Sequence, residues 1–229
     1  LAKRLVADGN EVTFVVAQFP GARTEEERDG FRIIRAGGRY SVYWHAYRLY
    51  KKQFQEWPDL VIDEMNTVPF FAKFYAKQKN IMLVHQLCRE IWFYQIFFPV
   101  SLVGYLVEPV YLWLLSDREV VTVSESTKQD LMRFGFKPQK IHIISEGIDI
   151  EPLLHLDSIE KYNQPTILSL GAVRAMKRTD HILKAFEILK KSIPNARLII
   201  AGPSEGSYGR NFIDTVKASP YAQDIEYVG

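Results

Sequence analysis

The sequence predicts an α/β fold of two domains with parallel β-sheets, and two observations lead to this prediction. First, short apolar runs alternate with segments whose apolar residues recur at helical spacing, which is typical of βαβ units. Second, the polar segment 151–164, followed by Pro165, separates two such series. We therefore expect one Rossmann-like domain over residues 1–160 and the start of another over residues 161–229.

Length and composition describe an ordinary globular protein. The 229 residues suffice for one large or two modest domains, and 47% of them are hydrophobic and 24% charged. The formal net charge of +2 does not indicate a nucleic-acid partner. Cys88 is the only cysteine, so no disulfide can form within the chain, and we expect a reducing, cytoplasmic compartment.

The first part of the chain predicts two strands between two helices. Residues 1–6 predict the end of a helix, and 11–17 and Phe31–Arg35 predict strands. The polar, turn-rich segment 19–30 predicts a loop. Aromatic residues at helical spacing predict a helix over 42–57.

The next two strand ends carry ionisable side chains. A strand over 59–63 ends in Asp63 and Glu64, which can act in acid–base chemistry or cap a helix that follows; we favour capping. A strand over 81–84 is followed by His85, which can contact a bound substrate or accept a proton at neutral pH. From the residues alone, a hydrogen-bonded structural histidine fits this position equally well.

The segment 91–115 is the most apolar part of the chain. Its uncharged stretch, 91–107, is shorter than the ~20 residues that span a bilayer, and Glu108-Pro109 then interrupts it. We therefore expect buried helices here. A patch that touches a membrane surface is the alternative, because exposed aromatic residues mark contact sites.

A capped helix follows the next strand. The apolar run 120–123 predicts a buried strand, and either Ser124 or Ser126 can cap the helix 128–134. Serine is favoured there because its hydroxyl accepts a hydrogen bond from a free N–H group of the first helical turn.

After the linker, the chain predicts a further βαβ unit. Thr166–Leu170 and Arg197–Ala201 are apolar runs that each end in glycine, and the segment between them has helical spacing. Asp180 can cap this helix. A short apolar run at the end, 225–228, predicts one more strand, with an exposed edge.

The loop between the first of these strands and its helix is basic. It carries Arg174, Lys177 and Arg178 beside a helix N-terminus, where free N–H groups and the helix dipole favour an anion. Ligands of such sheets bind outside the carboxyl ends of the strands. The pattern alone supports a phosphate cradle and a solvated basic turn about equally.

The sequence of this unit, GAVRAMKR followed by PNARLIIAG, resembles the opening of the donor-binding domain of family 4 glycosyltransferases. These are two-domain enzymes of the GT-B fold that use nucleotide sugars. In that family, an Arg directly after the strand-end Gly and a Lys five residues later hold the donor pyrophosphate. Lys177 matches the Lys, Ala172 stands at the Arg position, and Arg174 is a candidate substitute. The donor-binding residues that the resemblance implies are Gly171, Arg174, Lys177 and Gly202.

The first domain resembles the same family in two places. LAKRLVADGNEVT is similar to the family pattern LAxxLxxxGHEVT, and SESTKQDL with KIHIISEGID is similar to VSxxxKxxLxxxG and KIxVIxNGID. The family often places an active-site histidine where His85 stands, so the resemblance implies a catalytic role for it. Ser124, Glu146 and Gly147 would border the cleft, although Glu146 replaces the usual Asn.

The resemblance implies a retaining glycosyltransferase that moves a hexose from a nucleotide diphosphate sugar to a hydroxyl acceptor. The acceptor would be a glycan or a lipid-linked sugar, and neither a metal nor a cofactor is required. A peripheral contact with the inner membrane face is compatible with the apolar segment. A non-catalytic module that binds sugar nucleotides or anions, and a GT-B phosphorylase or epimerase, are the alternatives, because fold similarity alone does not decide among them.

The resemblance also implies that this is a partial sequence. The family's first strand and glycine-rich loop would precede Leu1, and its E-x7-E segment, which holds the donor sugar and ribose, would follow Gly229. We therefore expect the 229 residues alone to bind a donor poorly and to show no transfer.

Overall fold

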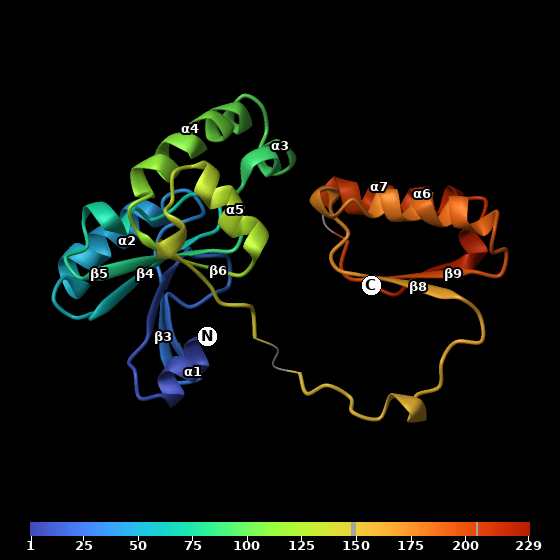
Figure 1. Ribbon diagram of the computed structural model, residues 1–229, viewed down its shortest axis with the longest axis horizontal. Helices are drawn as coiled ribbons and strands as arrows, with labels where there is room; N and C mark the ends of the chain where they lie inside the picture. The colour runs from blue at the N-terminus through green and yellow to red at the C-terminus, as the bar shows by residue number, and fades with distance from the viewer. Residues whose placement is uncertain (148–149, 205) are drawn as a thin grey trace. The chain divides into compact units, whose positions relative to one another are not determined.

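The computed structural model describes residues 1–147, 150–204 and 206–229, and the chain divides into two compact units, Leu1–Asp149 and Ile150–Gly229 (Figure 1). Each unit is an α/β structure with mainly parallel strands. The units divide just before the predicted linker, whose described part contains one short 3-10 helix, Leu156–Ser158. Residues 148–149, which end the segment KIHIISEGID, lie outside the described residues.

The first sheet of unit 1 has three strands in the order β1-β3-β2. The predicted helix and strands are confirmed as α1 (Ala2–Ala7), β1 (Thr13–Val16) and β3 (Phe31–Arg35), with β1 parallel to β3. The prediction of a loop throughout 19–30 was wrong, because Glu25–Arg28 forms β2, antiparallel to β3.

Cross-strand ion pairs explain why a polar segment forms this edge strand. Arg32 Nε contacts the carboxylate of Glu25 at 2.5 Å, and Arg35 Nη2 contacts that of Glu26 at 2.7 Å. Both pairs join diagonal positions of the ladder, which long side chains can span, and charged side chains also protect a sheet edge from pairing with other chains.

The predicted helix over 42–57 is confirmed as α2 (Val42–Leu49), which continues as one π-helical segment, Tyr50–Phe54. Val42, Ala46, Tyr50 and Phe54 are buried. They recur every four residues and therefore lie along one face of the helix, which packs toward Ile34 of β3.

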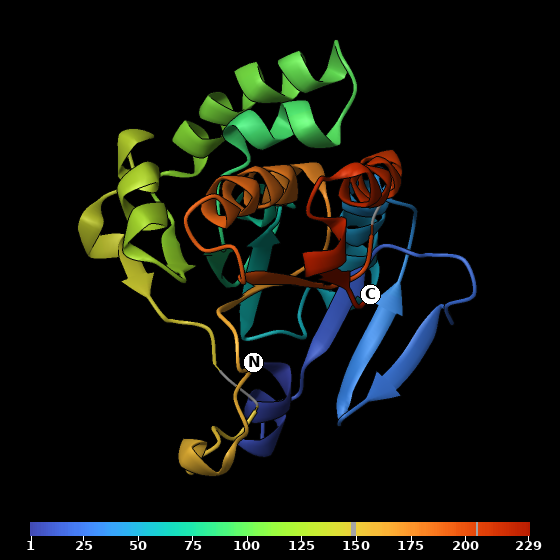
Figure 2. The same ribbon diagram turned by 90° about the vertical axis from the view of Figure 1, so that its right-hand side faces the viewer.

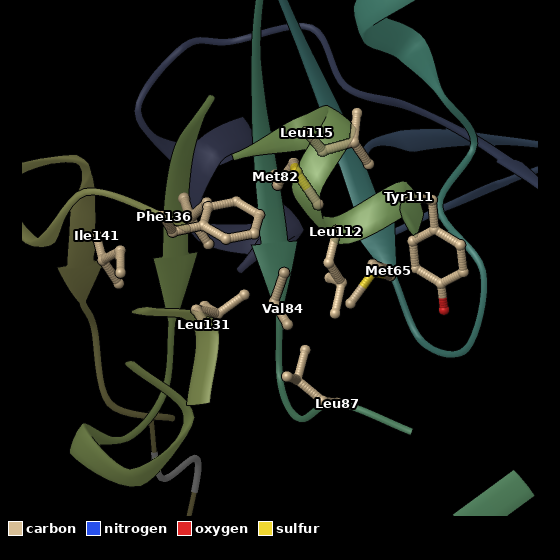
Figure 3. Packing of buried hydrophobic residues seen from close by; sticks show 11 residues of the cluster. Met65, Met82, Val84, Leu87, Tyr111, Leu112, Leu115, Leu131, Phe136 and Ile141 are labelled. Atoms are coloured by element: carbon tan, nitrogen blue, oxygen red, sulfur yellow. The ribbon is translucent and has the colours of Figure 1, made fainter. Parts of the chain in front are cut away.

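The second sheet of unit 1 is entirely parallel, with the order β4-β5-β6-β7. Its strands are β4 (Leu60–Met65), β5 (Lys79–Val84), β6 (Glu119–Thr122) and β7 (Ile141–Ile143). Figure 3 shows side chains of these strands converging with those of two helices. The cluster includes Met65, Met82, Val84, Leu112, Leu115, Val120, Leu131 and Ile141.

The helix expected directly after β4 is not formed. Only short 3-10 helices occur at Ala72–Phe74, Arg89–Ile91 and Pro138–Lys140. The favoured role of Asp63 as a helix cap was therefore wrong, but the residue is structural, since its two carboxylate oxygens accept hydrogen bonds from the N–H groups of Phe70 and Ala72 at 2.8 and 2.9 Å. Asp63 is buried, and this burial raises its pKa.

The apolar segment forms helices, as predicted, namely α3 (Trp92–Gln95) and α4 (Val100–Leu115). The expectation that they are buried is only partly right, because Val103, Leu106 and Trp113 of α4 are exposed. Within the described residues, no helix combines the length and apolar character that crossing a membrane requires. Gly104 allows the two helices to pack closely, because a Cβ atom there would lie 2.4 Å from the Trp92 ring. The next helix, α5 (Glu125–Arg133), follows β6.

Unit 2 has a parallel sheet in the order β10-β9-β8, made of β8 (Thr166–Leu170), β9 (Arg197–Ala201) and β10 (Ile225–Tyr227). Both helices, α6 (Thr179–Lys190) and α7 (Gly206–Ala218), lie on one face of this sheet in Figures 1 and 2. Two short 3-10 helices are Ala175–Lys177 and Ala222–Asp224. On β8, Leu168 and Leu170 are 60% and 81% exposed.

Candidate functional site

Four polar side chains lie at the carboxyl edge of the four-stranded sheet in unit 1. Glu64 is near the end of β4, His85 directly follows β5, Ser124 follows β6, and Glu146 follows β7. Because these strands are parallel, their carboxyl ends meet at one edge, where ligands of such sheets bind. Residues that are far apart in the sequence are thereby brought together.

His85 lies between two carboxylates. Its Nδ1 is 3.2 Å from Glu146 Oε1, and its Nε2 is 3.7 Å from Glu64 Oε1. The histidine side chain is 41% exposed, so a ligand can reach it. An imidazole held in this way can exchange a proton with a hydroxyl group or donate a hydrogen bond to it.

Glu64 was not predicted as a partner of His85. Successive side chains of a strand point to opposite faces, so the buried Asp63 binds the following backbone while Glu64 remains exposed. The sequence placed both carboxylates at one strand end. Only the alternation of the strand, combined with its pairing to β5, shows which of them faces the histidine.

The backbone of His85 is held by the start of α5. Thr127 Oγ1 donates a hydrogen bond to the His85 carbonyl oxygen at 3.1 Å. Ser124 is the N-cap of α5, since its hydroxyl oxygen accepts from the Thr127 N–H at 3.2 Å, which confirms one of the two predicted caps. Ser126 Oγ lies 3.0 Å from Ser124 Oγ. The cap thus also positions the group that holds His85.

Gly147 is close to the N-terminal helix. A Cβ atom at this position would lie 3.2 Å from Arg4 Nη1 of α1. The glycine therefore leaves space in which the arginine packs against the segment that carries Glu146.

In unit 2, two strand-end glycines form a tight approach. Gly171 and Gly202 have φ values of +144° and +136°, and a Cβ atom on Gly202 would lie 2.3 Å from the Gly171 carbonyl oxygen. Only glycine fits this geometry without strain. Val173 donates its N–H to the Pro203 carbonyl at 2.9 Å, so the chain stays paired beyond the glycines.

The basic loop begins after this tight approach. Arg174 starts the short 3-10 helix Ala175–Lys177, and Arg178, with φ of +51°, is the N-cap of α6. Lys177 and Arg178 are exposed. Three cations therefore occur within the five residues before α6, and a helix N-terminus beside positive charge favours an anionic ligand.

The prediction that Asp180 caps α6 was wrong. Asp180 lies inside the first turn, and its Oδ1 accepts a hydrogen bond from the Tyr208 hydroxyl of α7 at 2.8 Å. This hydrogen bond lowers the pKa of Asp180. The residue therefore joins the two helices of unit 2.

Within residues 1–147, 150–204 and 206–229, no group of three His, Cys, Asp or Glu side chains is arranged to hold a metal ion. The absence of a metal requirement stays a prediction.

Comparisons with known proteins agree with this architecture. The chain resembles solved structures titled OtsA (TM-score 0.63, 11% identity, 100% of this chain and 68% of that one) and TarM (TM-score 0.57, 14% identity, 80% and 35%). It also resembles Anabaena Alr3699/HepE in complex with UDP (TM-score 0.56, 12% identity, 96% and 69%). At such identities the likeness shows the fold alone, which is GT-B with two Rossmann-like domains. The chain spans about a third of the length of TarM.

Sequence comparisons identify the family. A search of curated proteins found no significant match. The family model for glycosyl transferases group 1 matches residues 155–229, and the model for glycosyltransferase family 4 matches residues 1–152. Because this second match covers most of its 229 residues, the chain belongs to glycosyltransferase family 4.

Proposed function

We propose that the protein transfers a hexose from a nucleotide diphosphate sugar to a hydroxyl acceptor, with retention of configuration, in glycan or glycolipid synthesis. The basic loop between β8 and α6, in a chain of this family, carries the proposal. Breaking the bond from sugar to phosphate builds negative charge on the nucleotide diphosphate, and fixed cations at a helix N-terminus stabilise that charge. Lys177 is the first residue that we assign to this role, and Arg174 the second.

We assign binding of the acceptor hydroxyl to the carboxyl edge of the β4–β7 sheet. In the transfer, the acceptor oxygen bonds to the anomeric carbon, the bond from that carbon to the phosphate oxygen breaks, and the hydroxyl proton leaves. His85 is accessible and lies between Glu64 and Glu146, so it can bind the hydroxyl or take its proton. Neither step requires a metal, because side chains carry the charge.

The test of the donor role uses the complete protein with Lys177→Ala. Nucleoside diphosphate binding should weaken by roughly 1.5–3 kcal/mol, the range for a hydrogen bond to a charged group, or about 10- to 150-fold in Kd. UDP is the first probe, because the similar HepE structure contains it. Calorimetry gives the affinity.

Lys217→Ala is the matched control, since this exposed lysine of α7 pairs with Asp214 and lies outside the loop. Arg174→Ala should have a smaller effect than Lys177→Ala. Unchanged UDP affinity in a folded Lys177→Ala variant would contradict the assignment. Sugar transfer that needs no acceptor hydroxyl would instead favour a phosphorylase or epimerase.

We also infer that the outer face of α4, together with the loop before it, contacts an anionic lipid surface. This outer face consists of side chains of α4 and of its preceding loop that are each more than half exposed: Phe97, Phe98, Val103, Leu106, Val110 and Trp113. The opposite side of α4 is buried in the core, so the helix is apolar on both sides, and such helices are normally covered. Aromatic side chains of this kind are typical of membrane interfaces.

Cations beside this face match an anionic partner. At the C-terminal end of α4, Asp117 is contacted by Lys73 at 2.7 Å and Arg118 at 3.0 Å, and Lys140 donates to its carbonyl at 2.6 Å. This end therefore carries net positive charge. The complete protein should sediment with phosphatidylglycerol vesicles and be released by high salt or carbonate. A protein that resists salt and carbonate and is extracted only by detergent would contradict a peripheral contact.

A further inference from the structure

A buried carboxylate lies behind the turn that carries His85. Glu108 of α4 is 0% exposed, and both of its oxygens accept hydrogen bonds from this turn. Oε1 accepts from the Cys88 N–H at 2.7 Å, and Oε2 accepts from the Arg89 N–H at 2.7 Å. Oε2 also accepts from the indole N–H of Trp92 at 3.0 Å.

A carboxylate without water is tolerated only when its charge is compensated. Arg89 provides the compensation, with Nη1 at 3.9 Å from Glu108 Oε2. The guanidinium group lies over the Tyr105 ring, 4.2 Å from its centroid, and donates to the Tyr105 carbonyl at 3.3 Å. Arginine suits this position because it binds a carboxylate and stacks on an aromatic ring at once.

The backbone of the turn has a conformation that an anion stabilises. Cys88 is in the right-handed helical region, and Arg89 has φ of +41°. Consecutive residues of opposite hand direct their N–H groups toward one point and form a concave anion site, called a nest. Positive φ is unfavourable for a residue with a side chain. Binding to the Glu108 carboxylate therefore explains why Arg89 has a positive φ.

The nest is close to the candidate active site along the chain. His85 precedes Cys88 by three residues, and Leu87 between them is buried in the sheet core. The segment 85–92 is thus held by Thr127 at the His85 carbonyl, by the core at Leu87 and by Glu108 at the nest. The nest is therefore one of three attachments that fix the backbone carrying the imidazole.

We propose that Glu108 is a positioning residue for His85, acting through the nest at Cys88 and Arg89. The proposal rests on the role of His85 in the transfer proposed above. A displacement of about 1 Å at a reacting group can lower a rate by about 10²-fold. Glu108→Gln has the same shape but no charge, and its amide presents a donor to one of the N–H groups. The backbone of Cys88 and Arg89 should then leave the conformation that the carboxylate stabilises.

The experiment compares Glu108→Gln with Tyr111→Phe in the complete protein. Tyr111 is a matched control, because it is buried on the same helix and donates its hydrogen bond to the Thr67 carbonyl, at 2.8 Å, rather than to the turn 85–92. In Glu108→Gln, amide hydrogen exchange in peptides covering 85–92 should be at least about tenfold faster, since one of the two nest N–H groups loses its acceptor and the other loses a charged one. In Tyr111→Phe it should stay as in the wild type.

The kinetic result distinguishes positioning from general stability. Glu108→Gln should lower kcat by about 10- to 100-fold and leave the KM for the nucleotide sugar unchanged. Tyr111→Phe should keep the wild-type kcat even if its thermal stability falls as much as that of Glu108→Gln. Unchanged exchange over 85–92, or an unchanged kcat in folded Glu108→Gln, would overturn the proposal.

Two further measurements keep the outcome clear. If Glu108→Gln does not fold, Trp92→Phe removes the indole donor to Glu108 together with part of the ring that packs on Gly104. This variant should shift exchange and kcat in the same direction by less, and no shift in either overturns the proposal. If the wild type transfers no sugar, the proposed function fails, while the imidazole NMR signals of His85 still test the positioning. They should change in Glu108→Gln and remain in Tyr111→Phe.

Discussion

The turn after β5 and the turn after β8 have the same topology but lie in different charge environments. Both follow the carboxyl end of a parallel strand. The first places His85 between two carboxylates, whereas the second gathers Arg174, Lys177 and Arg178 at the start of α6. From this comparison we infer that the fold sets the edge at which a ligand binds, while the side chains at the strand ends set what kind of ligand it is.

The two turns are also held differently. The turn after β5 is attached to a buried carboxylate and to the core, through Glu108 and Leu87. The turn after β8 is shaped by the close approach of Gly171 and Gly202, and its cations lie in a segment with two exposed side chains. We therefore expect changes at the first turn to alter turnover and changes at the second to alter donor affinity.

The largest expected effect is that of His85→Ala, which tests whether the first turn serves turnover. In the complete protein, kcat should fall by a factor on the order of 10² or more, as for the loss of a general acid or base. His142→Ala is the control, because His142 is exposed and pairs with Glu119 at 2.7 Å elsewhere in the sheet. A His85 variant that loses thermal stability but keeps its kcat would support a structural histidine instead.

Gly104→Ala probes the packing that holds the first turn. The new Cβ atom would lie 2.4 Å from the buried ring of Trp92, whose indole donates to Glu108. Overpacking of this kind costs roughly 1–3 kcal/mol, which urea unfolding would measure. Gly38→Ala is the control, because no atom lies within 4 Å of the added Cβ atom. Equal stability of the two variants would contradict the close packing of α3 on α4.

Glu146→Gln tests the charge beside His85. The glutamine keeps a hydrogen-bonding group near Nδ1, and an exposed ion pair contributes only about 0.2–1 kcal/mol, so kcat should fall less than about fivefold. Glu125→Gln, on the exposed first turn of α5, serves as control. Steady-state kinetics would measure kcat. A fall in kcat as large as in His85→Ala would show that Glu146 itself takes part in the chemistry.

Tyr208→Phe has the smallest expected effect and concerns the second turn. The Tyr208 hydroxyl lowers the pKa of Asp180, so its contribution is present above the ordinary aspartate value and is lost as the pH falls through the lower pKa of the folded state. The variant should be less stable at neutral pH by less than about 1 kcal/mol, since Asp180 is partly exposed.

The difference between Tyr208→Phe and the wild type should then shrink under acid conditions. Thermal unfolding measured from neutral pH to below the pKa of Asp180 checks this dependence. A stability difference that stays constant over the whole range would show that the ring packing of Tyr208, rather than its hydroxyl, joins the helices.

Local patterns in the sequence were sufficient for much of the fold. The strands β4, β5, β8 and β9 are apolar runs with clear ends, and their backbone preferences act within a few residues. Ser124 was predictable as a cap for the same reason. The position of Lys177 between a strand and a helix also follows from local pattern, together with the family resemblance.

The predictions were wrong where residues distant in the sequence determine the local structure. β2 is a polar segment whose pairing with β3 is stabilised by ion pairs of Arg32 and Arg35 with its glutamates. Asp180 is a good cap by residue type, but Tyr208 of α7 engages its carboxylate. In both cases an interaction between elements outweighs the preference of the segment itself.

The sequence by itself determined the alternation of strands and helices, the family and the basic loop, because each depends on residues close together in the chain. Tertiary structure alone placed Glu64 and Glu146 on His85 and Glu108 on the nest. Glu108 is separated from Cys88 by twenty residues and interrupts an apolar run, so the sequence shows only an isolated charge. Its partners are decided by how α4 packs on the turn, since hydrogen bonds of a buried group depend on position in space rather than along the chain.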